Sequence, residues 1–96
     1  MPTYITLGKY TDQGIRDIKD APNRVDAVQQ AVQQAGGRFV GWYLTFGEFD
    51  FVSIEELPDD EKALGLLLRV GQQGNVHTTT LRAFSRQEVE QVVATL

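Results

Sequence analysis

The sequence has no cysteine and only one histidine. Without cysteine the chain cannot form disulfides, thiolate metal sites or cysteine nucleophiles, which removes several classes of enzyme. A single histidine cannot build a multi-histidine metal site within one subunit, although two copies in a dimer could supply two. We therefore expect no metal site and no cofactor.

Basic residues and long hydrophobic runs are also scarce. Nine Lys and Arg residues stand against thirteen Asp and Glu, which gives a formal net charge of -4, and the basic residues form no stripe. This balance argues against nucleic acid as a partner. No apolar run approaches the ~20 residues that span a bilayer, and Met1–Ile5 shows no feature of a signal peptide. We expect a cytoplasmic protein that engages no membrane.

The composition that remains is typical of one folded domain. Hydrophobic residues make up 42% of the chain and charged residues 23%, so residues 1–96 are interpreted as a single domain. A chain of this size buries only about 60–65% of its unfolded surface, and a dimer interface would therefore add useful stability.

The first third of the chain predicts a strand and then an interrupted helix. Residues 3–9 are rich in β-forming side chains, and their alternation places Ile5 and Leu7 on the face opposite Tyr4. A helical pattern follows over about 12–35. It is interrupted by a restart with proline in a first turn, and a pair of glycines ends it.

Two apolar, aromatic strands are predicted over 38–46 and 50–56, joined by Gly47–Asp50. So short a connection permits only an antiparallel hairpin. One face would carry Val40, Trp42, Leu44, Phe46, Phe51 and Ser53. The other would carry Phe39, Gly41, Tyr43, Thr45, Asp50, Val52 and Ile54. Because both sets are largely apolar, the hairpin must be covered on both sides.

The last part of the chain predicts a helix, a strand and a second helix. Proline and three acids at 58–61 are typical of a helix start, and this helix runs to about Gln72. Residues 75–84 are rich in β-branched side chains and indicate a fourth strand. Ser85 and Glu88 have the spacing of a capping box before a C-terminal helix.

The order β-α-β-β-α-β with an added helix predicts an α+β, ferredoxin-like fold with a four-stranded antiparallel sheet and an extra C-terminal helix. We expect the helices to cover the face of Val52 and Ile54. The face of Trp42, Phe46 and Phe51 then needs another cover. A second copy packed sheet on sheet would give a homodimeric α/β barrel with a cavity between the sheets. The alternative is a monomer whose C-terminal helix folds over the sheet.

Several segments resemble the GYD domain family, and the similarity covers nearly the whole chain. The segments are Met1–Ile5, Thr11–Arg16, Gly47-Glu48-Phe49-Asp50, Gly74–Val76 and Thr79–Phe84. The family signature is usually Gly-Glu-Tyr-Asp, so the phenylalanine here removes a hydroxyl. The resemblance implies a ferredoxin-like, dimeric α/β barrel-type domain whose biochemical role is not established.

Asp50 and His77 are the candidate catalytic bases. Asp50 could be a carboxylate at a cavity mouth, or it could stabilise the hairpin turn through its own backbone. His77 shares a face with Leu81 and Ala83, which places it near the sheet edge on the predicted helix-covered side. A structural or exposed histidine is the alternative.

Arg82 is a candidate anion clamp because its parity points it into the face of Trp42. A guanidinium in a dry barrel needs a carboxylate, either Glu55 or a bound anionic ligand. The residues that we predict to line a ligand cavity are Tyr4, Trp42, Phe51, Ser53, Thr80 and Arg82.

The absence of any nucleophile, base and orienting residue set favours a non-catalytic role. The main prediction is a homodimeric module that binds a small ligand or another protein. The alternative is a cofactor-independent enzyme that acts on a small aromatic or polar substrate in the inter-sheet cavity. Its clamp would be Arg82 and its base Asp50 or His77.

Overall fold

The computed structural model describes all 96 residues. Its elements in chain order are β1 (Thr3–Tyr10), α1 (Asp12–Arg16), the 3-10 helix η1 (Ile18–Asp20), α2 (Ala21–Gln34), β2 (Arg38–Leu44), β3 (Phe51–Glu56), α3 (Asp60–Gln72), β4 (Val76–Ala83) and α4 (Arg86–Val93). None of the helices combines the length and the hydrophobicity that a membrane span requires. The predicted α+β class, the interrupted first helix and the extra C-terminal helix are confirmed.

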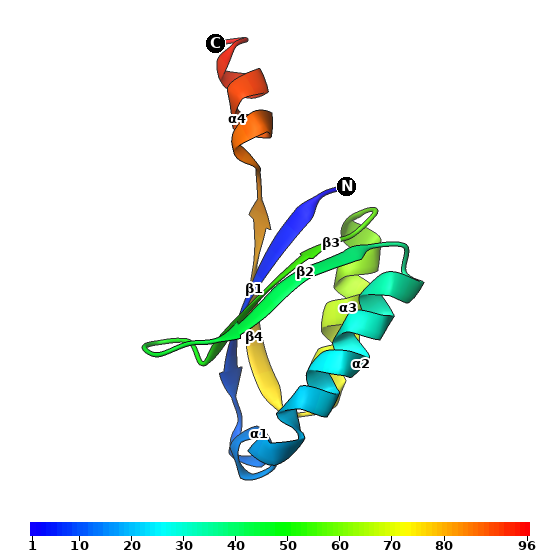
Figure 1. Ribbon diagram of the computed structural model, residues 1–96, viewed down its shortest axis with the longest axis vertical. Coiled ribbons are helices and arrows are strands. Elements are labelled where there is room, and N and C mark those ends of the chain that lie inside the picture. The colour runs from blue at the N-terminus through cyan, green and yellow to red at the C-terminus, as the bar shows by residue number, and fades with distance from the viewer.

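The four strands form one antiparallel sheet in the order β2-β3-β1-β4. This is the ferredoxin-like arrangement that the element order predicts. In the two central strands Ile5 lies opposite Ile54, and on its other side it lies opposite Leu81 of β4. Helices α2 and α3 lie together on one side of the sheet (Figure 1). We call the sheet face beneath them the covered face and the opposite one the open face.

Side-chain caps fix where the helices begin. The side chains of Thr11, Asp59 and Ser85 each accept a backbone N–H from the first turn of α1, α3 and α4, which satisfies one of the donors that a helix start leaves free. Ser85 and Glu88 form the full capping box that their spacing predicts. Helix α2 ends at Gln34, and Gly36 just beyond it has a φ of 86°, a left-handed conformation that favours glycine.

The hydrophobic core lies between the covered face and the two helices. Val32 of α2 and Leu57, after β3, are its most deeply buried side chains. Tyr4, Ala63 and Leu66 complete the buried cluster. Only 12 of the 96 residues are buried, so this single-sided core is small even for a domain of this size.

The two sheet faces are exchanged relative to the prediction. Tyr4, Phe51, Ser53, Thr80 and Arg82 belong to the covered face, because their register pairs them across β1, β3 and β4 with the buried set. The open face carries the aliphatic residues Ile5, Leu7, Val52, Ile54 and Leu81. Period-two alternation separates the two faces but does not say which one the helices cover. The hand of the β-α-β crossovers decides that.

A β-bulge in β2 changes the face of one aromatic residue. Phe39 pairs with Glu55 and Gly41 pairs with Ile54, so that Val40 has no partner. The extra residue places Phe39 on the same face as Trp42, whereas simple alternation predicted opposite faces.

The hairpin connection is longer than predicted. Strand β2 ends at Leu44 and β3 begins at Phe51. Phe46 therefore lies in the loop, fully exposed, and belongs to neither sheet face. Its predicted place beside Trp42 is wrong.

Helix α4 extends away from the sheet and does not fold over it (Figure 1). Val89, Val92 and Val93 are all exposed, so the alternative of a monomer sealed by its own C-terminal helix is contradicted. The radius of gyration is 14.4 Å, against about 12.5 Å for a compact domain of this length. The projecting helix and hairpin make the molecule extended.

Candidate functional site

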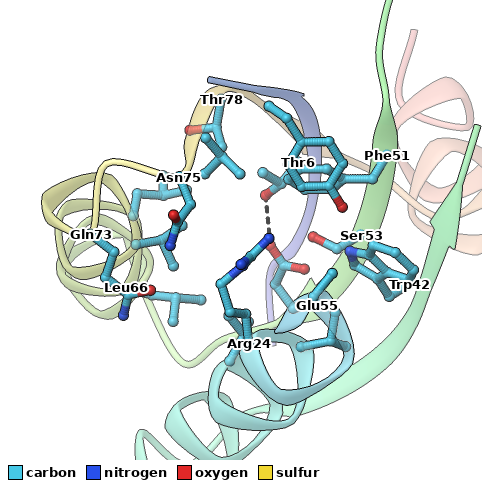
Figure 2. A pocket seen from close by; sticks show the side chains of 17 residues that line it. Thr6, Arg24, Trp42, Phe51, Ser53, Glu55, Leu66, Gln73, Asn75 and Thr78 are labelled. Atoms are coloured by element: carbon cyan, nitrogen blue, oxygen red, sulfur yellow. Dashed lines mark hydrogen bonds between the residues drawn. The ribbon is translucent and has the colours of Figure 1, made fainter. Parts of the chain in front are cut away.

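A cavity of about 80 Å³ lies between the covered face and helices α2 and α3. Figure 2 shows strands on two sides of it and helices on the others. Its walls are mostly apolar, with Trp42, Phe51 and Leu66 among them, and Ser53 and Glu55 supply polar atoms. One water needs roughly 10–15 Å³ by the same measure, so the space suits several waters or a small ligand.

Phe51 owes its place in the cavity wall to Gly8. The ring lies over this glycine so closely that a Cβ there would come within 2.0 Å of it. The same ring stacks on Trp42 with centroids 5.9 Å apart and tilts against Tyr10 at 5.4 Å. The three rings form one aromatic wall, of a kind that suits an apolar or cationic ligand.

Glu55 is the one carboxylate buried in this cavity. Glu55 is only 3% exposed, and the Thr6 hydroxyl donates a hydrogen bond to its Oε1 at 2.7 Å. Its Oε2 has no hydrogen-bond partner. Burial raises the pKa of Glu55, and the Thr6 hydrogen bond opposes this rise. The Ser53 hydroxyl is near enough to oppose it as well, but its geometry makes no hydrogen bond to Oε2.

The sequence pattern suggests Glu55 only as a carboxylate partner for Arg82 and does not identify it as a cavity residue. Its position in an alternating strand, two residues after Ser53, is the signal that could have placed it on the same face as the cavity. Charged side chains are seldom fully buried without a partner, which is why alternation alone did not single it out.

The polar residues Arg24, Gln73 and Asn75 also line the cavity. The Arg24 guanidinium donates to the backbone carbonyls of Asp17 and Gly14 at 3.0 and 3.3 Å, which holds it beside the start of α2. Burial raises the pKa of the Tyr10 hydroxyl on the same side, Arg24 opposes the rise and Asp50 adds to it.

Three of the predicted ligand-binding residues, Trp42, Phe51 and Ser53, come together around the cavity. Thr80 lies on the same face with a buried hydroxyl that has no partner.

The Tyr4 hydroxyl donates to Asp60 of α3. Burial, aided by that bond, raises the pKa of Tyr4 to about 12. The location of these predicted residues inside one subunit differs from the predicted inter-sheet cavity, and their ligand-binding role stays a prediction.

Arg82 does not pair with Glu55. Its guanidinium is exposed and lies over the ring of Phe84 at 4.3 Å and near that of Tyr4 at 5.9 Å, and it donates to the backbone carbonyl of Ala83. Because β4 is an edge strand, the guanidinium reaches solvent without crossing the core.

The three candidate catalytic residues do not converge. Asp50 accepts a hydrogen bond from the Tyr10 backbone N–H of β1 at 2.8 Å. Its role is structural, but through a bond to another strand and not through the backbone of its own turn as predicted. His77 is exposed, and its register opposite Lys9 places it on the open face instead of the predicted covered side. Arg82 lies five residues further along β4, about 16 Å away. Nowhere do three or more potential metal-ligating side chains come together.

The open face is an apolar surface with a charged rim. Its centre consists of half-buried or exposed apolar side chains and holds no charge. They are Ile5, Leu7, Tyr43, Val52, Ile54 and Leu81. At one end Arg38 and Glu56 form an ion pair with a nitrogen to oxygen distance of 3.1 Å, and Lys9 lies at the other. An apolar centre inside a polar rim is the usual anatomy of a protein interface.

The exposed area of the chain is larger than its mass requires. It measures 6575 Å², whereas a folded monomer of 10.7 kDa exposes about 5,500 Å². The excess of roughly 1,000 Å² is close to the ~800 Å² that each partner contributes to a standard interface.

Comparisons with known proteins agree with the fold and indicate a family. The GYD domain family matches residues 4–93. A Thermus thermophilus protein named "Glutamine synthetase and cystathionine beta-lyase binding protein" is 34% identical over 84 residues, which cover 86% of this chain and 88% of the relative. A crystal structure of a protein from Thermus thermophilus has a TM-score of 0.55 at 24% identity, covering 88% and 95% of the two chains. At that identity the likeness supports the fold alone.

Proposed function

We propose that this chain, which belongs to the GYD domain family, is a homodimeric interaction module that binds another protein. The observation that carries the proposal is the uncovered apolar face of its sheet. An apolar surface of this extent is seldom left in water by a soluble monomer. A cytoplasmic location stays a prediction.

The occupant that fits the open face best is a second copy of the same sheet. The centre of the face carries no charge that a partner would have to neutralise, and the excess exposed area equals roughly one side of a standard interface. In a two-fold symmetric interface the same patch of both copies meets. The charged rim of one copy would therefore lie beside the charged rim of the other.

The projecting parts of the chain favour the same arrangement. Helix α4 and the loop of Phe46 extend beyond their own sheet (Figure 1), and the apolar stripe of Val89, Val92 and Val93 has no cover within the subunit. In a sheet-on-sheet dimer these segments would lie beside the other copy, where their apolar side chains would leave water.

The protein partner is inferred from the relative. That Thermus thermophilus protein is named for binding two enzymes, glutamine synthetase and cystathionine beta-lyase, and it aligns over most of both chains. We infer that the present chain likewise binds a metabolic enzyme, as a dimer that offers two equivalent surfaces.

The test uses purified protein and two purified enzymes. Glutamine synthetase and cystathionine beta-lyase from the organism that encodes this chain are passed over the immobilised chain, and their binding is followed by surface plasmon resonance. Light scattering measures the oligomeric state of the chain. Saturable binding of either enzyme at micromolar or lower concentration is expected. Failure of a folded dimer to bind either one would reject this partner class, and a monomer at micromolar concentration would reject the dimer.

No specific observation favours the enzyme alternative. Its proposed base and clamp lie at opposite ends of β4, and Asp50 is engaged by the Tyr10 backbone. General acid-base chemistry needs these groups within hydrogen-bond reach of one substrate. This separation supports the interaction module over catalysis.

A further inference from the structure

We propose that the cavity beneath the sheet is a binding site for a small primary ammonium with a short apolar body, received by the Glu55 carboxylate. The inference concerns the interior of one subunit and does not depend on dimerisation or on the protein partner.

The polar feature that points to a ligand is the free oxygen of Glu55. The residue is 3% exposed, Thr6 satisfies its Oε1, and its Oε2 has no partner. Figure 2 shows the carboxylate among Thr6, Ser53 and Trp42, inside the ring of residues that surround the cavity. An unsatisfied buried acceptor costs free energy that a donor from a ligand would recover.

The charge of this acceptor selects the class of ligand. An ammonium supplies both the missing donor and a neutralising positive charge, which makes a charge-assisted hydrogen bond. A carboxylate or phosphate in contact with Glu55 would face repulsion from it. Arg24 also lines the cavity, but its guanidinium donates to the backbone carbonyls of Asp17 and Gly14. Burial raises the pKa of Glu55, and a bound cation would lower it again by favouring the charged form.

The walls select the rest of the ligand. Trp42 and Phe51 present stacked rings beside the acceptor, and Leu66 closes the helix side. Aromatic faces attract cations, most strongly where water is excluded. The cavity volume is about 80 Å³, and one water occupies roughly 10–15 Å³ of such a volume. The cavity therefore admits a ligand of only a few heavy atoms. The body must therefore be short.

The binding experiment reads the fluorescence of Trp42, the only tryptophan of the chain. The wild-type protein is titrated with n-butylammonium and with 1-butanol, its neutral counterpart of the same length. We expect n-butylammonium to bind at least about tenfold more tightly, as a hydrogen bond between charged groups predicts. Equal affinities, or no fluorescence response to the amine, would overturn the proposal.

Two variants separate Glu55 from charge in general. Glu55→Gln keeps the shape and the acceptor for Thr6 but removes the charge, and it should bring the two affinities to near equality. Glu56→Gln removes the same charge from the neighbouring residue on the open face and should leave the preference intact. An equal loss in both variants would contradict a role for Glu55. If Glu55→Gln alters the fold by circular dichroism, the amine-to-alcohol ratio of the wild type remains the deciding measurement.

Norvaline distinguishes the two sources of such an ammonium, because it is n-butylammonium with a carboxylate added on the carbon that bears the ammonium. Binding of norvaline that depends on Glu55 would support an amino acid as the ligand, with Arg24, which also lines the cavity, as the partner for its carboxylate. Binding of n-butylammonium alone would support a simple amine. Binding of neither compound would reject the site.

Discussion

The two faces of the sheet differ in the kind of side chain they carry. The covered face holds the polar residues Thr6, Ser53 and Glu55 under the helices beside its aromatic rings, while the open face presents the aliphatic Ile5 and Leu7 with nothing over them. A sheet with one solvated face normally places its aliphatic side chains inward. This division supports the proposal that another chain covers the open face, and the polar groups beneath the helices support the proposal of a ligand site on the covered face.

The small core fits this interpretation. Deep burial is confined to a few residues such as Val32 and Leu57, and part of the space above the sheet is cavity. Interiors are normally filled to the density of organic crystals, so a retained cavity with a polar floor weakens the fold of the single subunit. Association of two sheets would offset that weakness.

The largest effect is expected from a charge placed on the open face, because it should prevent the proposed dimer. Leu81→Arg should weaken dimerisation by about 100-fold or more, because a buried unpaired guanidinium costs several kcal/mol. Leu81 is 46% exposed, and Leu68, on the outer side of α3, is 61% exposed. Leu68→Arg is therefore the matched control and should leave the dimer intact. Analytical ultracentrifugation measures both, and dissociation by the control alone would refute the assigned interface.

The next largest effect concerns the buried carboxylate of the covered face. Because burial raises the pKa of Glu55, the folded protein holds the proton more tightly than the unfolded chain. Stability should fall as the pH rises from the ordinary value of 4.5 through the raised folded-state pKa. Glu55→Gln should remove that decline and raise stability near pH 7 by about 1 kcal/mol.

Thermal unfolding as a function of pH, at fixed protein concentration, checks this prediction. Glu56→Gln on the open face is the matched variant, and its effect on the pH dependence of stability should have the opposite sign. The Arg38 guanidinium, through its hydrogen bond, lowers the pKa of Glu56, so the stability that Glu56 adds is present above its unfolded pKa and is lost as the pH falls through the folded one. If both variants shift the profile in the same direction, the contrast between the faces is not electrostatic.

A smaller effect comes from two neighbouring threonines of β4. Thr80 points to the covered face, and its buried hydroxyl has no partner, whereas Thr79 is exposed on the open face. Thr80→Val should therefore stabilise the fold by about 1 kcal/mol by removing the unsatisfied group. Thr79→Val should change the stability of the subunit by less than ~0.5 kcal/mol. Urea unfolding measures both, and destabilisation by Thr80→Val would show that the hydroxyl is satisfied in solution.

The smallest effect on the core is expected from the cap of α4. Ser85→Ala removes the capping-box acceptor, which is worth about 1 kcal/mol to a helix. Because α4 lies outside the core of its own subunit, the loss in protein dissociated to the monomer should appear as faster amide hydrogen exchange within α4 and leave the global unfolding midpoint unchanged. A matching drop in the midpoint would mean that α4 belongs to the cooperative unit.

The elements, and the ends that side-chain caps mark, were predictable because their signals are local. The capping box at Ser85 and the period-two pattern of β1 each involve residues a few positions apart. The bulge at Val40 was not predictable, since it depends on how β2 meets β3. It moved Phe39 to the other face. The exposed place of Phe46 likewise followed from where the strand pairing ends.

Local sequence patterns were enough to predict the order of strands and helices, the ferredoxin-like class, the GYD resemblance and two sheet faces with different side chains. Which face the helices cover became clear from the folded chain alone, and with it the burial of Glu55 and the exposure of Leu81. The reason is physical: periodicity fixes which residues share a face, whereas the hand of the crossovers and the long-range register fix what lies above it.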